Sequence, residues 1–283
     1  MDGAAIAQKT VFILGITSDI GKALAQRYLR DGYAVVGTYR NLEGLQYLSS
    51  QASVDLLHCD VAEVDSVRSA IREYSRLSRT WDVFISCVGT LEPIGGFFDS
   101  DFEAWERSVI LNSTAQLRVL HALYPYRRQD QVSHAVYFAG GGTNNPFTNY
   151  SAYCVSKILL IKMCELLDDE TNDLNVFIVG TGWVRTKLHI QTVNNAPRAG
   201  QNYQRTVEFM ESNNPGTSYD DIYNCINWCV KQGRAIIGGR NFSVVHDPWR
   251  QGGETLARQL LGDFNKFKLR RFKNTELEPD GQN

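Results

Sequence analysis

The chain has 283 residues and a mass of 31.9 kDa; 43% of its residues are hydrophobic and 21% are charged. Its 29 lysine and arginine residues nearly balance 31 aspartate and glutamate residues, which gives a net charge of −2. These values exclude an intrinsically disordered chain and argue against a general nucleic-acid-binding protein, which would carry a strong excess of basic residues.

Short apolar runs alternate with helical patterns along the chain. Most runs are continuous, as expected of strands that are buried on both faces of a parallel sheet. The predicted strands are Val11–Gly15, Ala34–Tyr39, Val54–Asp60, Asp82–Gly89, Ala135–Gly140, Asn175–Gly180 and Arg234–Gly239. Helical spacing starts at Ile20, and Asp65–Leu77 and Asp101–Tyr124 have helix-favouring composition. This order predicts one α/β domain over 1–283: a Rossmann-like doubly wound parallel sheet of about seven strands with helices on both faces.

The first predicted strand runs into the turn Gly15-Ile-Thr-Ser-Asp-Ile-Gly21 and then into a helix. Gly15 would permit the tight turn, and Gly21 would let the helix pack closely on the strand. The helix N-terminus would offer unpaired N–H groups to a pyrophosphate. Asp19, whose charge such a ligand repels, is expected to cap the helix start, while Thr17 and Ser18 offer hydroxyls to phosphate or ribose.

The second predicted strand ends in Tyr39-Arg40-Asn41. A fold that prefers NAD usually has an acidic residue near this point to hold the ribose 2′-hydroxyl. Arg40 would instead bind a 2′-phosphate through two hydrogen bonds, so NADP(H) is predicted in preference to NAD(H). A solvated arginine that stacks on adenine without selecting the phosphate is the alternative.

A polar segment over Gln191–Thr217 interrupts the regular alternation and surrounds one helix-like piece, Thr206–Ser212. Because it follows the sixth predicted strand, it would lie beyond the carboxyl ends of the strands, where open α/β sheets bind ligands. It is therefore predicted to form a substrate lid over about 187–217. The alternative is a passive surface loop.

Tyr153 and Lys157 are one helical turn apart and share a helix face, after the fifth predicted strand. A phenol has a pKa near 10, but a nearby ammonium and the positive nicotinamide of an oxidised cofactor would favour the phenolate. Such a tyrosine would exchange a proton with a carbonyl or alcohol as hydride is transferred. A small-molecule carbonyl or alcohol is thus the expected substrate.

Several motifs follow one another in order along the chain. After GITSDIG at 15–21 come Cys59-Asp60-Val61, Asp82–Gly89, the stretch from Trp105 to Asn112, the YxxxK pair of Tyr153 and Lys157, and Gly182–Thr186. In this order the chain resembles the short-chain dehydrogenase/reductase superfamily over about residues 10–240. The resemblance implies an NAD(P)-dependent oxidoreductase.

The resemblance also implies roles for particular residues. Asp60 and Val61 should contact the adenine, and Gly89 should lie against the adenosine. Thr186 should contact the nicotinamide carboxamide. Asn112 should sit at a helix irregularity and hold a water that links the lysine to solvent, the alternative being a helix-interior polar residue. The expected catalytic residues are Asn112, Tyr153 and Lys157, and the expected cofactor contacts are Gly15, Thr17, Ser18, Asp19, Ile20, Gly21, Arg40, Asp60, Val61, Gly89, Tyr153, Lys157 and Thr186.

Three features depart from the family pattern. Ser86–Gly89 replaces the usual Asn-Asn-Ala-Gly, and Asp19 replaces the second glycine of the turn. The serine expected thirteen residues before the tyrosine is Gly140. That serine orients the substrate carbonyl, and Thr143 or N–H groups of the glycine run are the candidates to replace it. A catalytically attenuated, dinucleotide-binding regulatory protein is therefore the alternative function.

The C-terminal extension, about 246–283, has a weaker resemblance to a subgroup found in bacterial surface-carbohydrate gene clusters. It includes His246-Asp-Pro-Trp249 and the basic and apolar run Phe264–Lys273. A sugar-derived substrate is the candidate that this resemblance suggests. The basic run would hold an anionic substrate, dock on a partner subunit, or form a solvated tail with a few anchoring aromatic residues.

The six cysteines show no CxxC pair. Cys225 and Cys229 are spaced as half of a metal site, but no histidine or second pair supports one, so no metal is expected. Buried, reduced cysteines indicate a cytoplasmic protein. The N-terminus lacks a signal-peptide pattern, and no apolar run approaches the roughly 18 residues of a membrane span. Apolar faces near 101–124 and 151–168 suggest a homodimer or homotetramer.

Overall fold

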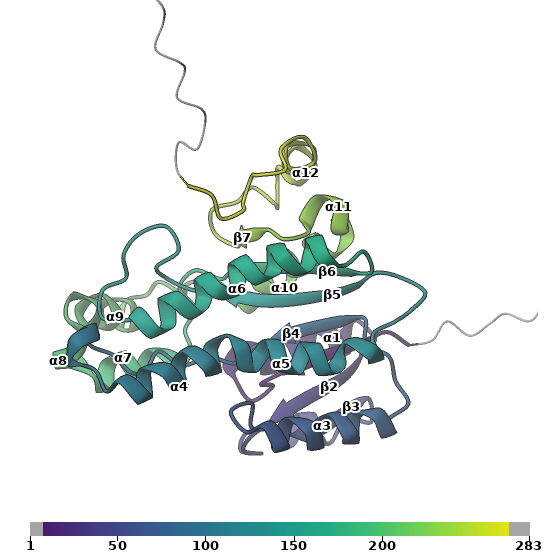
Figure 1. Cartoon of the computed structure of the whole chain (residues 1–283), viewed down its shortest axis with the longest axis horizontal. Helices are drawn as coiled ribbons and strands as arrows, with labels where there is room; N and C mark the ends of the chain where they lie inside the picture. Colours follow the sequence, from purple (N-terminus) through teal and green to yellow (C-terminus); the bar gives the residue numbers. More distant parts are fainter. Residues whose placement is uncertain (1–7, 272–283) are drawn as a thin grey trace, which may run out of the picture.

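The computed structural model describes residues 8–271 (Figure 1). Seven strands form one sheet: β1 (Thr10–Leu14), β2 (Ala34–Tyr39), β3 (Val54–His58), β4 (Val83–Ser86), β5 (Ser133–Ala139), β6 (Leu174–Gly180) and β7 (Asn241–Ser243). All neighbouring strands are parallel, in the order β3-β2-β1-β4-β5-β6-β7. The predicted fold class is confirmed.

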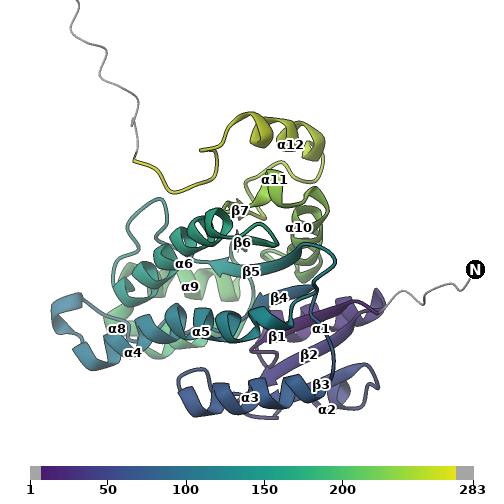
Figure 2. The ribbon, with the colours of Figure 1, turned by 45° about the vertical axis from the view of Figure 1, so that its right-hand side comes forward.

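Helices cover both faces of the sheet (Figure 1, Figure 2). They are α1 (Asp19–Arg30), α2 (Gln46–Ser49), α3 (Val64–Arg76), α4 (Phe102–Asn112), α5 (Thr114–Leu123), α6 (Ser151–Glu170), α7 (Leu188–Asn194), α8 (Ala196–Ala199), α9 (Gln201–Glu211), α10 (Tyr219–Gln232), α11 (Arg234–Ile237) and α12 (Gly253–Gly262). The core residues of α1, α10, α11 and α12 pack on one face. Those of α3, α5 and α6 pack on the other.

The strands are continuous apolar runs because both of their faces are buried. In β1, Val11 and Ile13 pack toward α1 and α10, whereas Phe12 and Leu14 pack toward α3 and α5. All five residues of this strand are buried. Successive side chains of a strand point to opposite faces, so a sheet between two helical layers needs apolar residues at every position.

The prediction of a strand over Arg234–Gly239 is wrong. Its first four residues form α11, Gly239 adopts a φ of +70°, and β7 starts at Asn241. The apolar run Ala235–Ile237 is less than one helical turn long. Periodicity cannot distinguish a helix from a buried strand in so short a run.

Two helical predictions also need correction. The predicted helical segment over 101–124 is divided at Ser113, whose φ of −138° and ψ of −86° separate α4 from α5. The polar segment Gln191–Thr217 holds the end of α7 and all of α8 and α9, rather than the single piece Thr206–Ser212. Helix α9 starts at Gln201, before the start at Thr206 that the sequence predicted.

The part of the C-terminal extension that the structure describes packs against β7 and α6 of the same chain. The N–H of Asn241 in β7 donates to the carbonyl of Phe267 at 2.8 Å, and the Phe267 ring meets Phe242 edge-on at 5.6 Å. Arg270 makes two hydrogen bonds to the carboxylate of Glu165 on α6, at 2.6 and 3.0 Å. The basic run is thus anchored to α6 and β7 up to Arg270, while Phe272 and Lys273 lie outside the described residues.

No helix within residues 8–271 is both long and apolar enough to cross a membrane. All six cysteines are free thiols.

Candidate active site

The turn after β1 depends on two glycines. Gly15 has a φ of +79°, and a Cβ there would lie 2.9 Å from the side chain of Val88. A Cβ at Gly21 would lie 2.6 Å from the carbonyl oxygen of Gly15. Both distances are too short for real contacts, so a side chain at either position would push the turn away from β4 or α1. The Gly15 N–H donates to the hydroxyl of Thr38 at 2.9 Å, a contact that the sequence did not reveal.

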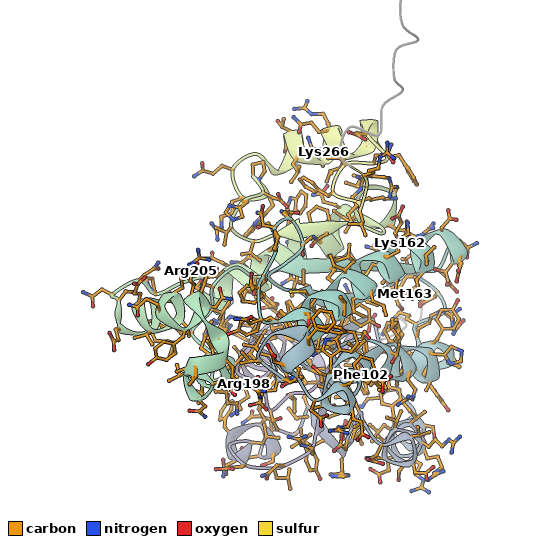
Figure 3. All side chains as sticks on the ribbon, turned by 60° about the vertical axis from the view of Figure 1, so that its left-hand side comes forward. Phe102, Lys162, Met163, Arg198, Arg205 and Lys266 are labelled. Carbon is orange, nitrogen blue, oxygen red and sulfur yellow. The ribbon has the colours of Figure 1, made fainter. Side chains whose placement is uncertain are left out.

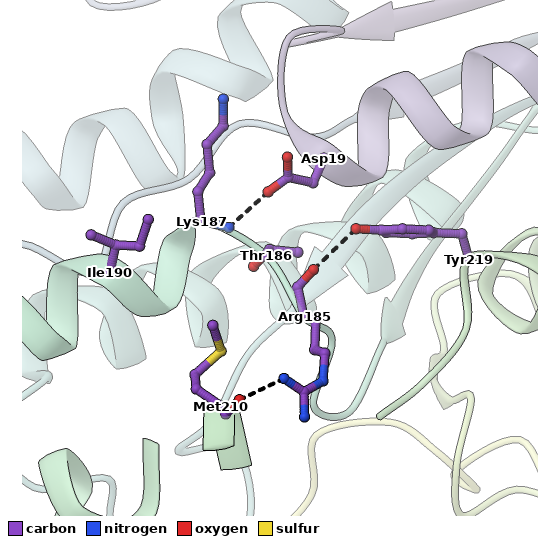
Figure 4. A pocket seen from close by; sticks show the side chains of 7 residues that line it. All are labelled: Asp19, Arg185, Thr186, Lys187, Ile190, Met210 and Tyr219. Atoms are coloured by element: carbon purple, nitrogen blue, oxygen red, sulfur yellow. Dashed lines mark hydrogen bonds between the residues drawn. The ribbon is translucent and has the colours of Figure 1, made fainter. Parts of the chain in front are cut away.

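Asp19 does not cap the start of α1, contrary to the prediction. The N-cap is Ser18, whose hydroxyl accepts from the N–H of Gly21 at 3.0 Å. The Asp19 carboxylate instead accepts from the N–H of Lys187, at 2.7 Å (Figure 4). Thr17, in the same turn, is half-buried.

The other expected cofactor contacts lie at the carboxyl ends of neighbouring strands. Arg40 follows β2, is exposed, and makes no ion pair with any residue in 8–271. After β3, the Asp60 carboxylate accepts from the N–H of Ala62 at 3.0 Å, and Val61 is buried. Gly89 follows β4 and is exposed.

These strand ends lie at a topological switch point of the sheet. β1 lies between β2 and β4. The chain leaves β1 through α1 on one face of the sheet, and it leaves β4 toward β5 through α5 on the other. Open α/β sheets bind ligands at such a switch point, outside the carboxyl ends of their strands.

Tyr153 and Lys157 lie in the first two turns of α6. Both are buried, with 8% and 4% of their surface exposed, and the Lys157 Nζ lies 5.6 Å from the centre of the Tyr153 ring. Asn112 is the last residue of α4, directly before the break at Ser113. Its side chain donates to the carbonyl of Thr90 and accepts from the Thr90 N–H, both at 2.9 Å. Asn112 thereby connects the end of α4 to the segment that follows Gly89.

Burial controls the protonation of this pair. It raises the pKa of the Tyr153 phenol above its ordinary value, and it lowers the pKa of Lys157 from 10.5 to about 8. The neighbouring ammonium alone does not offset the burial of the phenol; the phenolate expected from the sequence also depends on the positive charge of an oxidised nicotinamide. Tyr153 is therefore a neutral phenol near pH 7, and Lys157 is still mostly protonated.

The ring of Tyr153 occupies the space that a side chain at position 140 would need. A Cβ at Gly140 would lie 2.5 Å from the tyrosine Cζ, and closer still to Cε1 and the hydroxyl oxygen. A serine therefore does not fit beside the tyrosine in this position. The hydroxyl of Thr143 donates to the carbonyl of Gly140 at 3.2 Å, so the tyrosine and the threonine both contact this glycine.

Helices α7 to α9 are held over the start of α6. The Gln191 Oε1 accepts from the N–H of Leu91 at 2.7 Å, and Tyr150 shares a hydrogen bond of 2.9 Å with Thr192. Tyr153 belongs to a small apolar cluster with residues from the segment after β4, from the residue before α6 and from α8. These residues are Leu91, Ile94, Tyr150 and Ala199. No local sequence pattern reveals these contacts, because they join segments about forty to a hundred residues apart.

An open cleft of about 350 Å³ lies between the first turn of α1 and the start of α7 (Figure 4). It is lined by Asp19, Arg185, Thr186, Lys187, Ile190, Met210 and Tyr219. Thr186, expected from the family pattern, thus lies opposite the glycine-containing turn. The Arg185 guanidinium donates to the carbonyls of Phe209 and Met210, at 2.9 and 2.7 Å, and so holds the end of α9.

Comparison with known proteins identifies the family. Residues 15–244 match a family model described as enoyl-(acyl carrier protein) reductase. The chain belongs to the short-chain dehydrogenase/reductase superfamily. The family and the enzyme class predicted from the motifs, an NAD(P)-dependent dehydrogenase or reductase, are confirmed.

Three relatives in this superfamily share less than a quarter of their aligned residues with this chain. It is 24% identical to serine 3-dehydrogenase of Rhizobium radiobacter over 231 residues, which are 80% of this chain and 90% of the relative. It is 23% identical to the NADPH-dependent pterin aldehyde reductase of Arabidopsis thaliana, over 65% of this chain and 78% of the relative. The crystal structure of the short-chain dehydrogenase/reductase YIR035C from Saccharomyces cerevisiae has a TM-score of 0.76 at 18% identity, covering 85% of this chain and 97% of that one.

The dinucleotide cofactor of short-chain dehydrogenases/reductases fits the residues at this switch point of the sheet. The turn carries no side chain at Gly15 and Gly21, where the neighbouring segments leave no room for one. The N-terminus of α1 borders the open cleft and would hold the diphosphate through backbone N–H groups. The exposed guanidinium of Arg40 lies at the end of the neighbouring strand, where the adenosine ribose of a dinucleotide is held in such folds.

Proposed function

We propose that this short-chain dehydrogenase/reductase uses NADP(H) in preference to NAD(H). It would interconvert a carbonyl and a secondary alcohol on a small polar substrate, for which a sugar derivative is the candidate. The observation that carries the proposal is the buried pair of Tyr153 and Lys157 on one face of α6, at the carboxyl edge of the sheet and beneath α7 to α9. Helices α7 to α9 would then act as the substrate lid.

Tyr153 is the acid and base of the proposed reaction. When bound, the dinucleotide supplies or accepts the hydride. The neutral phenol donates its proton to the carbonyl oxygen during reduction, and the phenolate removes a proton from the alcohol during oxidation. Lys157 stabilises that phenolate through its ammonium group and would also hold the ribose hydroxyls.

Asn112 is proposed to complete the proton relay to solvent. Its amide side chain is held in place by both polar backbone groups of Thr90. Its position directly before the helix break at Ser113 favours this role over that of a helix-interior polar residue, because the regular hydrogen-bond series of α4 ends there.

The proposed site has no serine hydroxyl for the substrate carbonyl. The groups that would replace it are the Tyr153 hydroxyl itself, the N–H groups of the glycine run that starts at Gly140, and the Thr143 hydroxyl, which would exchange its hydrogen bond to the Gly140 carbonyl for one to the substrate. Glycines let a backbone approach a substrate closely, and backbone N–H groups stabilise a developing negative charge on oxygen.

The preference for NADP(H) is supported by Arg40. Its guanidinium is exposed and has no carboxylate partner among residues 8–271, so it is free to bind a 2′-phosphate. Asp60 and Val61 would line the adenine on the next strand end. One relative, from Arabidopsis thaliana, is named as NADPH-dependent.

A homodimer or homotetramer is supported by apolar side chains on the outer faces of α4 and α6. Phe102 and Ile110 of α4 are 55% and 44% exposed, and Val155 of α6 is 45% exposed. Figure 3 shows Phe102 and Met163, one from each helix, on the same side of the molecule. Light scattering coupled to gel filtration measures the oligomeric state, and a monomer would contradict this proposal.

The proposed reaction is tested by following NADPH oxidation with a panel of aldehydes, ketones and keto-sugars. Tyr153→Phe is the matched variant, because it removes only the hydroxyl. The variant is expected to lose at least about 10²-fold in turnover while it still binds NADPH. Full turnover by Tyr153→Phe would exclude the tyrosine as the acid and base.

A regulatory protein that binds the dinucleotide without turnover is the second candidate. It is favoured by one observation, namely that the Tyr153 ring fills the place of the missing serine. NADPH binding with no turnover of any panel compound would support it. Absence of NADPH and NADH binding would contradict both candidates.

A further inference from the structure

Asp19 joins two segments on opposite sides of the open cleft. Its Oδ2 accepts a hydrogen bond from the N–H of Lys187 at 2.7 Å, although 168 residues separate the two in the chain (Figure 4). Asp19 is the first residue of α1, and Lys187 directly precedes α7. Within residues 8–271, no other hydrogen bond joins the turn Gly15–Gly21 to the segment Thr186–Asn194.

We propose that Asp19 is a positioning residue that latches the start of the lid to the cofactor turn, and that its charge weakens the binding of the cofactor. The first half rests on the hydrogen bond itself. The second half rests on the proposed function, because it requires the diphosphate to bind at the start of α1.

The hydrogen bond from Lys187 to Asp19 supplies a cap that α7 otherwise lacks. The N-cap position of this helix is Lys187, and no side chain of its own segment caps the helix. The carboxylate of Asp19 supplies the missing acceptor from a different helix. An anionic acceptor at a helix N-terminus also interacts favourably with the helix dipole, so the bond orders the first turn of α7.

The charge of Asp19 acts in the opposite sense on the cofactor. A diphosphate at the N-terminus of α1 would lie close to this carboxylate, and two negative groups repel each other. The family pattern has a glycine at this position. Aspartate in place of glycine therefore introduces both the hydrogen bond to Lys187 and the repulsion of the diphosphate. Substitutions at Asp19 separate these two effects.

Loss of the latch would leave the rest of the lid in place. Gln191 and Thr192 bind Leu91 and Tyr150 on the substrate side of the lid. Asn202 of α9 donates to the carbonyl of Thr148 at 2.9 Å. A substitution at Asp19 therefore frees the segment around Lys187, and the folded protein remains available for measurement.

Two variants separate the two effects. Asp19→Asn keeps an oxygen acceptor for Lys187 but removes the charge, whereas Asp19→Ala removes both. Asp65→Asn is the control for net charge, because Asp65 is a 93% exposed side chain on α3. Hydrogen exchange of peptides that contain the Lys187 amide reports on the latch, and NADPH fluorescence titration reports on the affinity.

The expected results differ between the variants. In Asp19→Ala, the Lys187 amide should exchange about tenfold faster than in the unaltered protein, while Asp19→Asn should stay close to it. Both should bind NADPH about three- to tenfold more tightly at low salt, and the gain should shrink as salt is added. Asp65→Asn should change neither measurement.

Each half of the proposal has a result that overturns it. Unchanged exchange at Lys187 in Asp19→Ala would show that the hydrogen bond does not order the lid. Equal or weaker NADPH binding by both variants would show that the charge does not oppose the cofactor. If the unaltered protein bound neither NADPH nor NADH, the proposed function and the second half would fail together, while the exchange measurement would still decide the first half.

Discussion

Restoring the family's serine at position 140 is expected to lower the activity of this chain. The reasoning from the motif alone predicts the opposite, because a serine hydroxyl at this position stabilises the developing charge in the family's reaction and its loss costs about 10²- to 10³-fold in rate. The structure instead predicts a loss of activity. Gly140→Ser adds a Cβ to a position where the Tyr153 ring already lies.

The magnitude follows from the geometry. The added Cβ would lie at most 2.5 Å from the tyrosine Cζ, whereas ordinary contacts begin near 3.4 Å. The ring must therefore move by about 1 Å or more. A displacement of 1 Å in a reacting group costs about 10²-fold in rate, so the serine variant should retain roughly a hundredth of the turnover.

The assay compares Gly140→Ser, Gly140→Ala and Tyr153→Phe on the same substrate, with NADPH affinity as the second measurement. Both variants at position 140 should lose kcat to a similar extent and keep their NADPH affinity, because the clash involves the Cβ that they share. Tyr153→Phe sets the lower limit of activity. If Gly140→Ser were as fast as or faster than the unaltered protein, the argument from the packing of the tyrosine would be refuted.

Three further predictions concern separate residues. Arg40→Asp should weaken NADPH binding at least about tenfold and change NADH binding little, which fluorescence titration of both cofactors would check; equal losses would contradict the role of the 2′-phosphate. Asn112→Ala should lower stability by about 1–3 kcal/mol in denaturant unfolding, because Thr90 loses two hydrogen bonds, and an unchanged midpoint would contradict this. Lys157→Met should raise the thermal midpoint near pH 7. Burial lowers the pKa of this lysine from 10.5 to about 8, so its destabilising effect is complete below pH 8 and disappears as the pH rises toward 10.5. The difference between the variant and the unaltered protein should therefore shrink toward pH 10, and a difference that is independent of pH would exclude this explanation.

The parts of the fold that were predicted from the sequence have local causes. Continuous apolar runs identify strands buried on both faces, and six of the seven predicted strands overlap strands of the sheet. The failure at Arg234–Gly239 has a local cause as well, because a short apolar run before a glycine pair suits one helical turn as well as a strand. The ends of α4 and α5 were missed because the break at Ser113 lies within a continuous helical composition.

The parts of the site that escaped prediction depend on contacts between distant segments. Asp19 looks like a capping residue in its own turn, yet its partner is Lys187. Gly140 looks like a missing serine, and only the position of Tyr153 shows that the space is filled. Both residues depart from the family pattern. At such positions the motif indicates that something has changed, whereas the neighbours determine the physical consequence.

The electrostatics of the pair favour the tyrosine as a proton donor. Burial raises the pKa of Tyr153, so the protein without a cofactor holds a neutral phenol, which is the form that carbonyl reduction consumes. The phenolate that remains after proton transfer faces the ammonium of Lys157, whose own pKa of about 8 leaves it charged near pH 7. Oxidation of an alcohol has to start from that phenolate and therefore needs an additional positive charge near the ring, which the oxidised nicotinamide would supply. In the proposed reaction the protonation state of the site would thus depend on the redox state of the bound cofactor, and the reductive direction would require the smaller change in the pKa of Tyr153.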